Sequence, residues 1–210
     1  MIARPPLFLP LLALTALLVL AVPVLTDWAP LDRADHALSE TFRGYGDQRP
    51  GLVSTLRILT DVAATVPFLV AGLLATILLA VRRDRRTAVF CATVTVTVPV
   101  LWGLAHWLLH NPRPLDGFVT VTSNGFPSGH TSNATAAALV VVLLAWPGLA
   151  RTGRFVVVTA ATAFAGFVGL TRVALLAHWP TDVLGGWLLA LAVVPLVAYA
   201  VRERAPACAG

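Results

Sequence analysis

Six apolar runs, separated by shorter polar stretches, dominate the pattern of hydrophobic and polar positions along this chain. They cover residues 7–25, 62–81, 88–109, 131–146, 155–171 and 183–201. A helix that crosses the hydrocarbon core of a bilayer needs about 20 mainly apolar residues. The fourth and fifth runs are a little short, so we expect them to include flanking residues or to tilt little. The pattern predicts an all-α integral membrane protein, a bundle of six transmembrane helices.

The first run can be interpreted as a secretory signal peptide or as a helix that the mature protein keeps. It is longer than the usual apolar core of a signal peptide, about 7–15 residues, and no convincing cleavage site of small residues follows it. We therefore expect a retained helix. With it, residues 1–210 form a single membrane-embedded domain.

Residues 26–61 are polar and acidic, in contrast to the runs around them. Apolar side chains nevertheless recur there at helical spacing, at Leu31, Ala34, Leu38 and Phe42. This spacing indicates an amphipathic segment on the membrane surface, and a plain solvated loop is the alternative.

The composition agrees with a protein that has lipid as its solvent. Hydrophobic residues make up 58% of the chain and charged residues 12%, whereas an ordinary soluble domain has roughly 25% charged residues. All basic residues are arginines, and they lie at the ends of the runs, so we expect no nucleic-acid partner. Cys91 and Cys208 have neither disulfide nor metal spacing. We expect no metal site and no cofactor.

The arginines also predict how the bundle is oriented. Nine of the 15 basic residues fall near the chain ends and in the joints at 82–86 and 151–154, and the other six fall on the opposite side. Short cytoplasmic loops carry the excess of arginine. Both termini are therefore predicted to be cytoplasmic, and the connections at 110–130 and 172–182 to face outward from the plasma membrane.

Arg113 is the centre of the first of three polar clusters, which covers residues 106–114. Pro112 and Pro114 flank this arginine and restrict its backbone, and Asn111 with Pro112 ends the preceding helix. A rigidly presented guanidinium suits bidentate binding of phosphate. The alternative is an arginine that anchors a helix end among lipid headgroups.

The second cluster is Pro127-Ser128-Gly129-His130, directly before the fourth run. Ser128 can cap this helix, and the free N–H groups of its first turn form an anion site with the positive end of the helix dipole. Gly129 allows a ligand to approach the backbone closely. The alternative is an ordinary helix cap with an idle histidine at the interface.

The third cluster begins at Thr171-Arg172 and includes His178 and Asp182. Pro180 suits the first position of the last helix, so Asp182 falls in the first turn and can reach back to His178. A carboxylate that holds one imidazole nitrogen fixes the tautomer and leaves the other nitrogen free to attack. The alternative is that Asp182 only caps the helix.

All three clusters lie at the outer ends of predicted spans. Together they supply cations and N–H donors for phosphate oxygens, a nucleophile, and an acid for the leaving group, which phosphoryl transfer requires. These residues resemble the type-two phosphatidic acid phosphatase superfamily, membrane lipid phosphatases that share an active-site design with acid phosphatases and vanadium haloperoxidases. The residues that match the spacing of the family motifs are Arg113-Pro114, Pro127-Ser128-Gly129-His130, and Arg172 with His178 and Asp182, within a motif core at 106–182.

The resemblance implies that His178 attacks phosphorus to form a phosphohistidine and that Asp182 orients it. By the same resemblance, His130 protonates the leaving oxygen and later activates water. Phosphate binding without a metal would fall to Arg113, Arg172, Ser128 and the backbone at Gly129.

The chain departs from the family pattern at two positions. His106 stands where the family has a lysine, and Thr171 where it has a serine. Threonine keeps the hydroxyl, whereas His106 replaces a permanent cation with one that titrates. We expect His106 to contribute to phosphate binding, with His110 as an alternative.

The predicted function is therefore that of a lipid phosphate phosphatase. The resemblance implies, as candidate substrates, undecaprenyl diphosphate, phosphatidic acid, phosphatidylglycerol phosphate and other polyprenyl phosphates. The sequence does not indicate which of these lipids is the substrate, and it does not indicate the oligomeric state. The alternatives are a non-catalytic membrane protein that binds or transports lipid, and haloperoxidase-like chemistry on bound vanadate.

Overall fold

Helices make up the regular structure of the part that the computed structural model describes, residues 2, 3 and 5–203. They are α1 (Phe8–Leu25), α2 (Ala29–Asp47), α3 (Pro50–Thr60), η1 (Asp61–Ala63), α4 (Thr65–Val81), α5 (Arg85–Leu108), α6 (Gly129–Ala145), η2 (Trp146–Gly148), α7 (Arg151–Ala174) and α8 (Pro180–Glu203).

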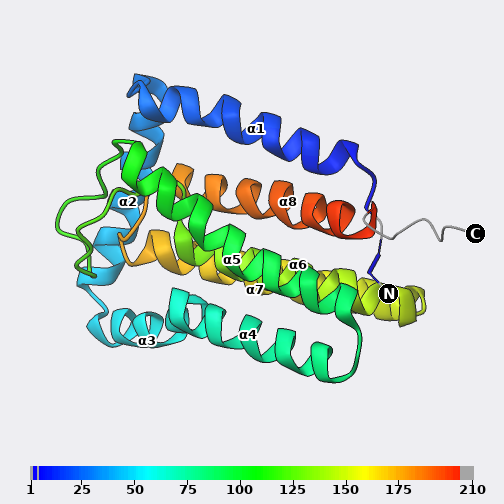
Figure 1. Ribbon diagram of the computed structural model, residues 1–210. Helices are drawn as coiled ribbons and strands as arrows, with labels where there is room; N and C mark the ends of the chain where they lie inside the picture. The colour runs from blue at the N-terminus through cyan, green and yellow to red at the C-terminus, as the bar shows by residue number, and fades with distance from the viewer. Residues whose placement is uncertain (1, 4, 204–210) are drawn as a thin grey trace, which may run out of the picture.

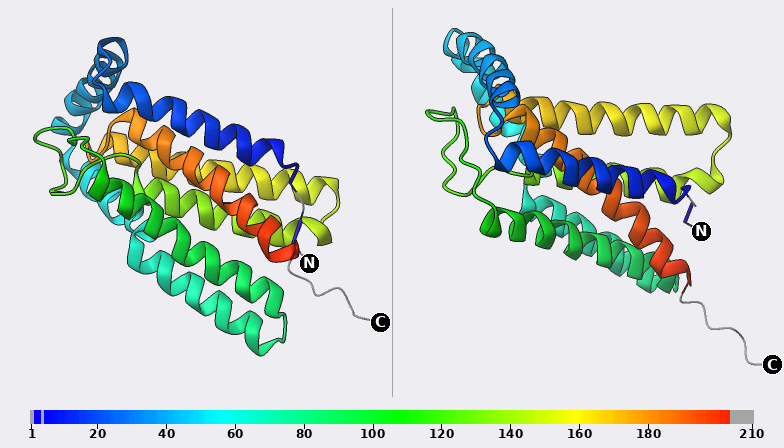
Figure 2. Two further views of the ribbon diagram at one scale, coloured as in Figure 1. Left: turned by 45° about the horizontal axis from the view of Figure 1, so that its top comes forward. Right: turned by 90° about the horizontal axis from the view of Figure 1, so that it is seen from above.

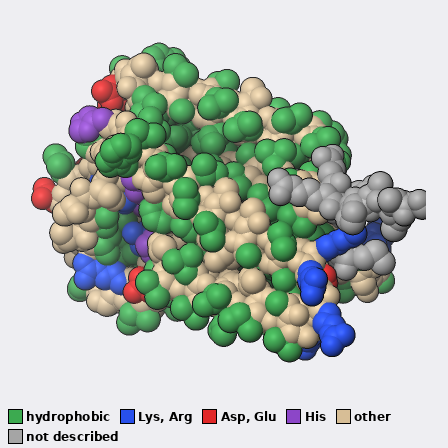
Figure 3. All heavy atoms as spheres, in the orientation of Figure 1, with side chains coloured by type: hydrophobic (Ala, Val, Ile, Leu, Met, Phe, Trp, Pro, Cys, Tyr) green, Lys and Arg blue, Asp and Glu red, His purple; other side chains and the backbone are tan. Residues whose placement is uncertain are grey.

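Within the described residues, six helical stretches are long and apolar enough to cross a membrane, which confirms the prediction of six spans. One stretch, Pro50–Val81, combines α3, η1 and α4, and another, Gly129–Gly148, combines α6 with η2. Large apolar side chains such as Leu74 and Phe155 are 62% and 72% exposed on the flanks of the bundle, where Figure 3 shows a largely apolar surface. Lipid satisfies such a surface, so the protein is a multi-pass membrane protein.

The spans lie lengthwise beside one another, and α8 occupies a central place among them. It packs against α1, α5, α6 and α7. The start of α1 and the end of α8 lie at one end of the bundle, whereas α2 lies across the other end (Figures 1 and 2).

Small and β-branched side chains fill the centre of the bundle. Val94 and Val98 of α5, Ala136 of α6, and Ala190 and Val194 of α8 are buried in one apolar cluster. Small side chains let membrane helices approach closely, and close contact stabilises such bundles because lipid tails provide no hydrophobic drive between helices. The packing therefore fixes where the beginnings of α6 and α8 lie relative to each other.

The predicted segment at 26–61 contains a helix, α2, but its last residues belong to the second apolar stretch instead. α2 turns the polar Asp35 and Ser39 toward the bundle, while Leu38 remains 49% exposed. The chain then starts a new helix at Pro50 that leads into the second span. The sequence interpretation ended the surface segment too late because the apolar run that includes Leu52 and Ile58 is broken by a few polar residues.

Candidate active site

The three polar clusters meet at the end of the bundle that α2 crosses. The α5–α6 connection, the first turn of α6 and the α7–α8 joint all lie at this end (Figure 1). The space-filling view shows histidine and arginine side chains behind the connecting loop there (Figure 3).

His178 and Asp182 form the buried centre of this arrangement. They are 2% and 0% exposed, and Nδ1 of His178 lies 3.2 Å from Oδ2 of Asp182. The same Oδ2 accepts the backbone N–H of Trp179 at 3.0 Å, and Oδ1 accepts Nδ2–H of Asn111 at 2.8 Å. The helix begins at Pro180 as predicted. Three donors thus hold the carboxylate in place.

Arg113 lies against the other side of the His178 ring. Its Nη1 is 2.7 Å from Nε2 of His178 and also donates to the carbonyl of Ala177 at 2.6 Å. Nε and Nη2 donate to the carbonyl and the hydroxyl of Ser123 and to the carbonyl of Asn124. All donors of this guanidinium are engaged, and an anion would have to replace some of these partners.

The contact with Arg113 determines the tautomer of His178. A guanidinium only donates hydrogen bonds, so Nε2 of His178 must accept and its proton must be on Nδ1, facing Asp182. Burial, and after it the charges of Arg113 and Arg172, hold the pKa of His178 well below its ordinary value. The imidazole is therefore neutral at pH 7, with its unprotonated nitrogen facing Arg113.

The first turn of α6 is built as the sequence predicts. The hydroxyl of Ser128 accepts hydrogen bonds from the backbone N–H and the hydroxyl of Thr131, so Ser128 is the helix cap. Within the described part of the chain, the N–H groups of Gly129 and His130 have no hydrogen-bond acceptor. Their position at a helix start makes them donors for an anion.

Gly129 has a packing role that the sequence does not reveal. A Cβ at this position would lie 3.1 Å from the indole of Trp102. Its missing side chain thus lets α6 pack against α5, and what Gly129 can offer a ligand is its backbone N–H.

Arg172 has a buried donor that an anion would suit. This arginine is 4% exposed, and its Nε is one of two buried polar side-chain atoms without a hydrogen-bond partner among the described residues. A buried cation with an unused donor is costly unless an anion binds it. The hydroxyl of the preceding Thr171 donates to the carbonyl of Val168 and accepts from the hydroxyl of Thr60 in α3.

His106 lies close to the centre but is already engaged. Its Nε2 donates to the carbonyl of Pro127 at 2.8 Å, and its ring centroid is 6.4 Å from that of His178. The alternative residue, His110, is exposed. Of the two histidines, His106 is therefore the one beside the candidate site.

Sequence reasoning missed the polar residues that support the loop before α6. Asn124 donates to the carbonyl of His106 at 2.9 Å and accepts the N–H of Asn111 at 3.3 Å. Ser123 and Asn124 stand before Gly125 in a stretch that resembles an ordinary turn. Nothing in their spacing indicates that they hold Arg113.

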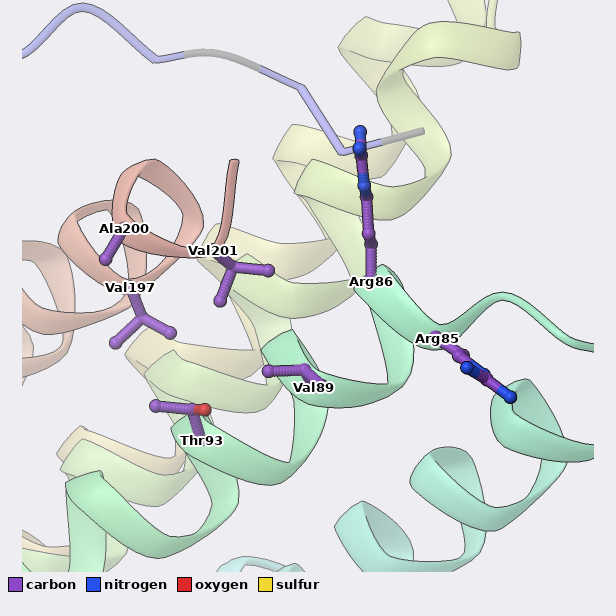
Figure 4. A pocket seen from close by; sticks show the side chains of 7 residues that line it. All are labelled: Arg85, Arg86, Val89, Thr93, Val197, Ala200 and Val201. Carbon is purple, nitrogen blue, oxygen red and sulfur yellow. The ribbon is translucent and has the colours of Figure 1, made fainter. Parts of the chain in front are cut away.

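The opposite end of the bundle is basic, and among the described residues none of these groups lies there. A cavity of about 340 Å³ lies there between α5 and α8, lined by Val89, Thr93 and Val197 among others. Figure 4 shows Arg85 and Arg86 at its edge, with their side chains pointing away from it. The two ends thus differ in chemistry.

Comparisons with known proteins agree with this arrangement. Residues 105–206 match the model of the PAP2 superfamily. The crystal structure described as that of the first transmembrane PAP2 type phosphatidylglycerolphosphate phosphatase from Bacillus subtilis matches with a TM-score of 0.82 and 25% sequence identity, over 94% of this chain and 98% of that chain. Among curated proteins, no sequence matches.

The fold and these matches define an integral membrane phosphatase, which is a hydrolase. The chain is similar to the PAP2 superfamily over residues 105–206 and to the Bacillus subtilis phosphatase over most of its length.

Proposed function

We propose that the protein hydrolyses the phosphate monoester or diphosphate of a membrane lipid through a phosphohistidine at His178, without a metal. The observation that carries the proposal is the orientation of the His178 imidazole between Asp182 and Arg113. Asp182 accepts from its Nδ1–H, and its unprotonated Nε2 accepts from the guanidinium of Arg113, a bond that a phosphate oxygen would replace. A neutral, oriented nitrogen beside a cation is what attack on a phosphate requires.

The reaction proceeds in two displacements. Nε2 of His178 attacks phosphorus as the bond to the lipid oxygen breaks, and His130 gives its proton to that oxygen. A water molecule then loses a proton to His130 and attacks the phosphohistidine, which releases inorganic phosphate and restores His178. Each step transfers one phosphoryl group between two nucleophiles, and His130 returns to its starting state.

Phosphate binding falls to the groups around Nε2. Arg113 and the unpaired Nε of Arg172 supply charge, and the free N–H groups of the first turn of α6 supply directed donors. The remaining members of the proposed set are Ser128, Gly129 and His106.

A lipid is the substrate class that suits this location. The centre lies at the ends of membrane spans and beside the surface helix α2, where the headgroup of a lipid would sit while its tail stays in the bilayer. The arginine-rich opposite end favours an orientation with both termini in the cytoplasm, so the site faces outward from the plasma membrane. The neighbouring structure is a phosphatidylglycerolphosphate phosphatase, which makes phosphatidylglycerol phosphate a candidate beside phosphatidic acid and undecaprenyl diphosphate.

Phosphate release by the purified protein tests this function. The protein in detergent, with a metal chelator present, should release phosphate from at least one of these three lipids, and His178→Ala should release none. Absence of release from all three, or equal release by His178→Ala, would overturn the proposal.

A further inference from the structure

Asp35 of α2 reaches into the joint between α7 and α8, although the proposed chemistry makes no use of it. Its side chain is 8% exposed. Oδ1 accepts the backbone N–H of Thr181 at 3.1 Å, and Oδ2 accepts the hydroxyl of Thr181. Thr181 is the second residue of α8 and directly precedes Asp182.

The hydrogen bonds of Asp35 complete the first turn of α8. The first N–H groups of a helix have no partner inside the helix. Those of Asp182 and Val183 turn back to the carbonyl of Trp179, at 3.1 and 3.3 Å, whereas that of Thr181 is satisfied from α2. A carboxylate in this place also interacts favourably with the helix dipole. Asp35 thus acts as a cap supplied from another part of the chain.

A second contact from α2 falls on the residue directly after His178. The ring of His36 packs against Trp179, with 4.5 Å between ring centroids. The indole Nε1 of Trp179 donates in turn to the carbonyl of Pro112, next to Arg113. Helix α2 therefore contacts Trp179, which directly follows His178, and Thr181, which directly precedes Asp182.

We propose that Asp35 is a positioning residue for phosphoryl transfer: by holding the start of α8 against α2, it keeps Asp182, and through it the ring of His178, in the attacking orientation. The inference rests on the proposed function, because it assigns Asp35 a role in the same reaction. Burial of Asp35 between α2 and α8 limits the water that competes for the contact, and this favours a defined geometry.

Four variants test the inference, with kcat and KM measured for wild type and each variant on one lipid phosphate. Asp35→Ala removes both hydrogen bonds, and its kcat should fall by about 10- to 100-fold with KM changed less than about threefold, because a small displacement of a nucleophile slows chemistry more than binding. Asp35→Asn keeps an oxygen for the N–H of Thr181 and an NH₂ for its hydroxyl, so it should recover most of kcat.

Thr181→Val removes the hydroxyl bond alone and should lower kcat by roughly fivefold, the effect of one ordinary hydrogen bond. Asp47→Asn, which removes an equal charge at the exposed end of the same helix, should behave as wild type.

The outcomes separate this inference from the proposed function. An inactive wild type contradicts the function itself. With an active wild type and an inactive His178→Ala, a wild-type kcat in Asp35→Ala overturns the positioning role. Should Asp35→Ala not fold, as judged by its melting temperature in detergent, a wild-type kcat in Thr181→Val overturns it instead.

Discussion

At the scale of single residues, two neighbours of His178 determine its protonation, because a guanidinium only donates hydrogen bonds and a carboxylate only accepts them. Arg113 donates to Nε2 of His178, and Asp182 accepts from Nδ1. These two contacts permit only the tautomer of His178 with its proton on Nδ1. The burial of both His178 and Asp182 excludes water that would compete for these hydrogen bonds.

Asp182→Asn tests this hydrogen-bond assignment. The carboxylate accepts from His178, Trp179 and Asn111, and an amide in its place must turn an NH₂ toward one of these donors. The variant should still bind vanadate, because the arginines remain, but should lose about 10³- to 10⁴-fold in kcat, as a wrongly held imidazole does. Vanadate inhibition and turnover measured on one preparation separate the two effects. A loss of binding equal to the loss of rate would contradict the assignment.

The pKa of His178 leads to a prediction about acid. Burial, and then the charges of Arg113 and Arg172, lower this pKa, whereas a histidine in the unfolded chain takes up a proton near about pH 6.5. Below that pH the unfolded state therefore binds more protons than the folded state, and the free energy of unfolding contributed by His178 decreases as the pH falls.

Histidine-selective nitrogen NMR in detergent measures the lowered pKa of His178 directly. The signals that disappear in His178→Ala should remain those of a neutral ring protonated at Nδ1 as the pH is lowered to about 5.5, one unit below the ordinary value. Titration of these signals near pH 6.5 would show that the ring is not buried between Asp182 and Arg113.

At the scale of elements, glycines of α8 determine how closely its first turns approach α6. A Cβ on Gly186 would lie 2.8 Å from the carbonyl oxygen of Ser128 and 2.9 Å from Cβ of Thr131. Ser128 also donates its N–H to the carbonyl of Asp182 at 2.9 Å. The cap of α6 and the first turns of α8 therefore lie in close contact through their backbones.

Gly186→Ala should force these helices apart. Overpacking of this kind costs about 1–3 kcal/mol, and the displacement of α6 should lower kcat as well as the melting temperature in detergent. Gly166→Ala of α7 is the matched control, since a Cβ there meets nothing within 4 Å; it should leave kcat unchanged. Equal behaviour of the two variants would contradict the role given to Gly186.

The sequence predicts a helix well where residues in or directly before that helix determine its length or its first residue. Apolar length predicts the spans, Ser128 the start of α6 and Pro180 the start of α8, because each depends on local chemistry. The hydrogen bonds of Asn111 and Asp35 join residues 71 and 146 positions apart. No local pattern encodes such pairs, since they exist only once the helices have packed.

At the scale of the whole molecule, the two ends of the bundle carry different chemistry. The candidate site lies at the end that α2 crosses, and arginines of the 82–86 joint lie at the other end (Figures 1 and 4). The excess of arginine in short loops predicts that this second end is cytoplasmic.

Cysteine labelling of whole cells tests this orientation. In a background with Cys91 and Cys208 replaced by serine, Leu115→Cys, at a position that is 80% exposed, should react with a membrane-impermeant maleimide. Thr152→Cys, exposed at the start of α7, should react only after the cells are opened. The reverse pattern would place the site in the cytoplasm and leave its chemistry unaffected.

Covalent trapping of phosphate tests the central claim, that His178 is the nucleophile. Wild-type protein mixed with lipid that carries ³²P in its terminal phosphate, and quenched in alkali within milliseconds, should carry label that acid removes, as a phosphohistidine does. Mass spectrometry should place this label on His178, and His178→Ala should carry none. Label of equal amount on His178→Ala, or label on another residue of the wild type, would contradict the account.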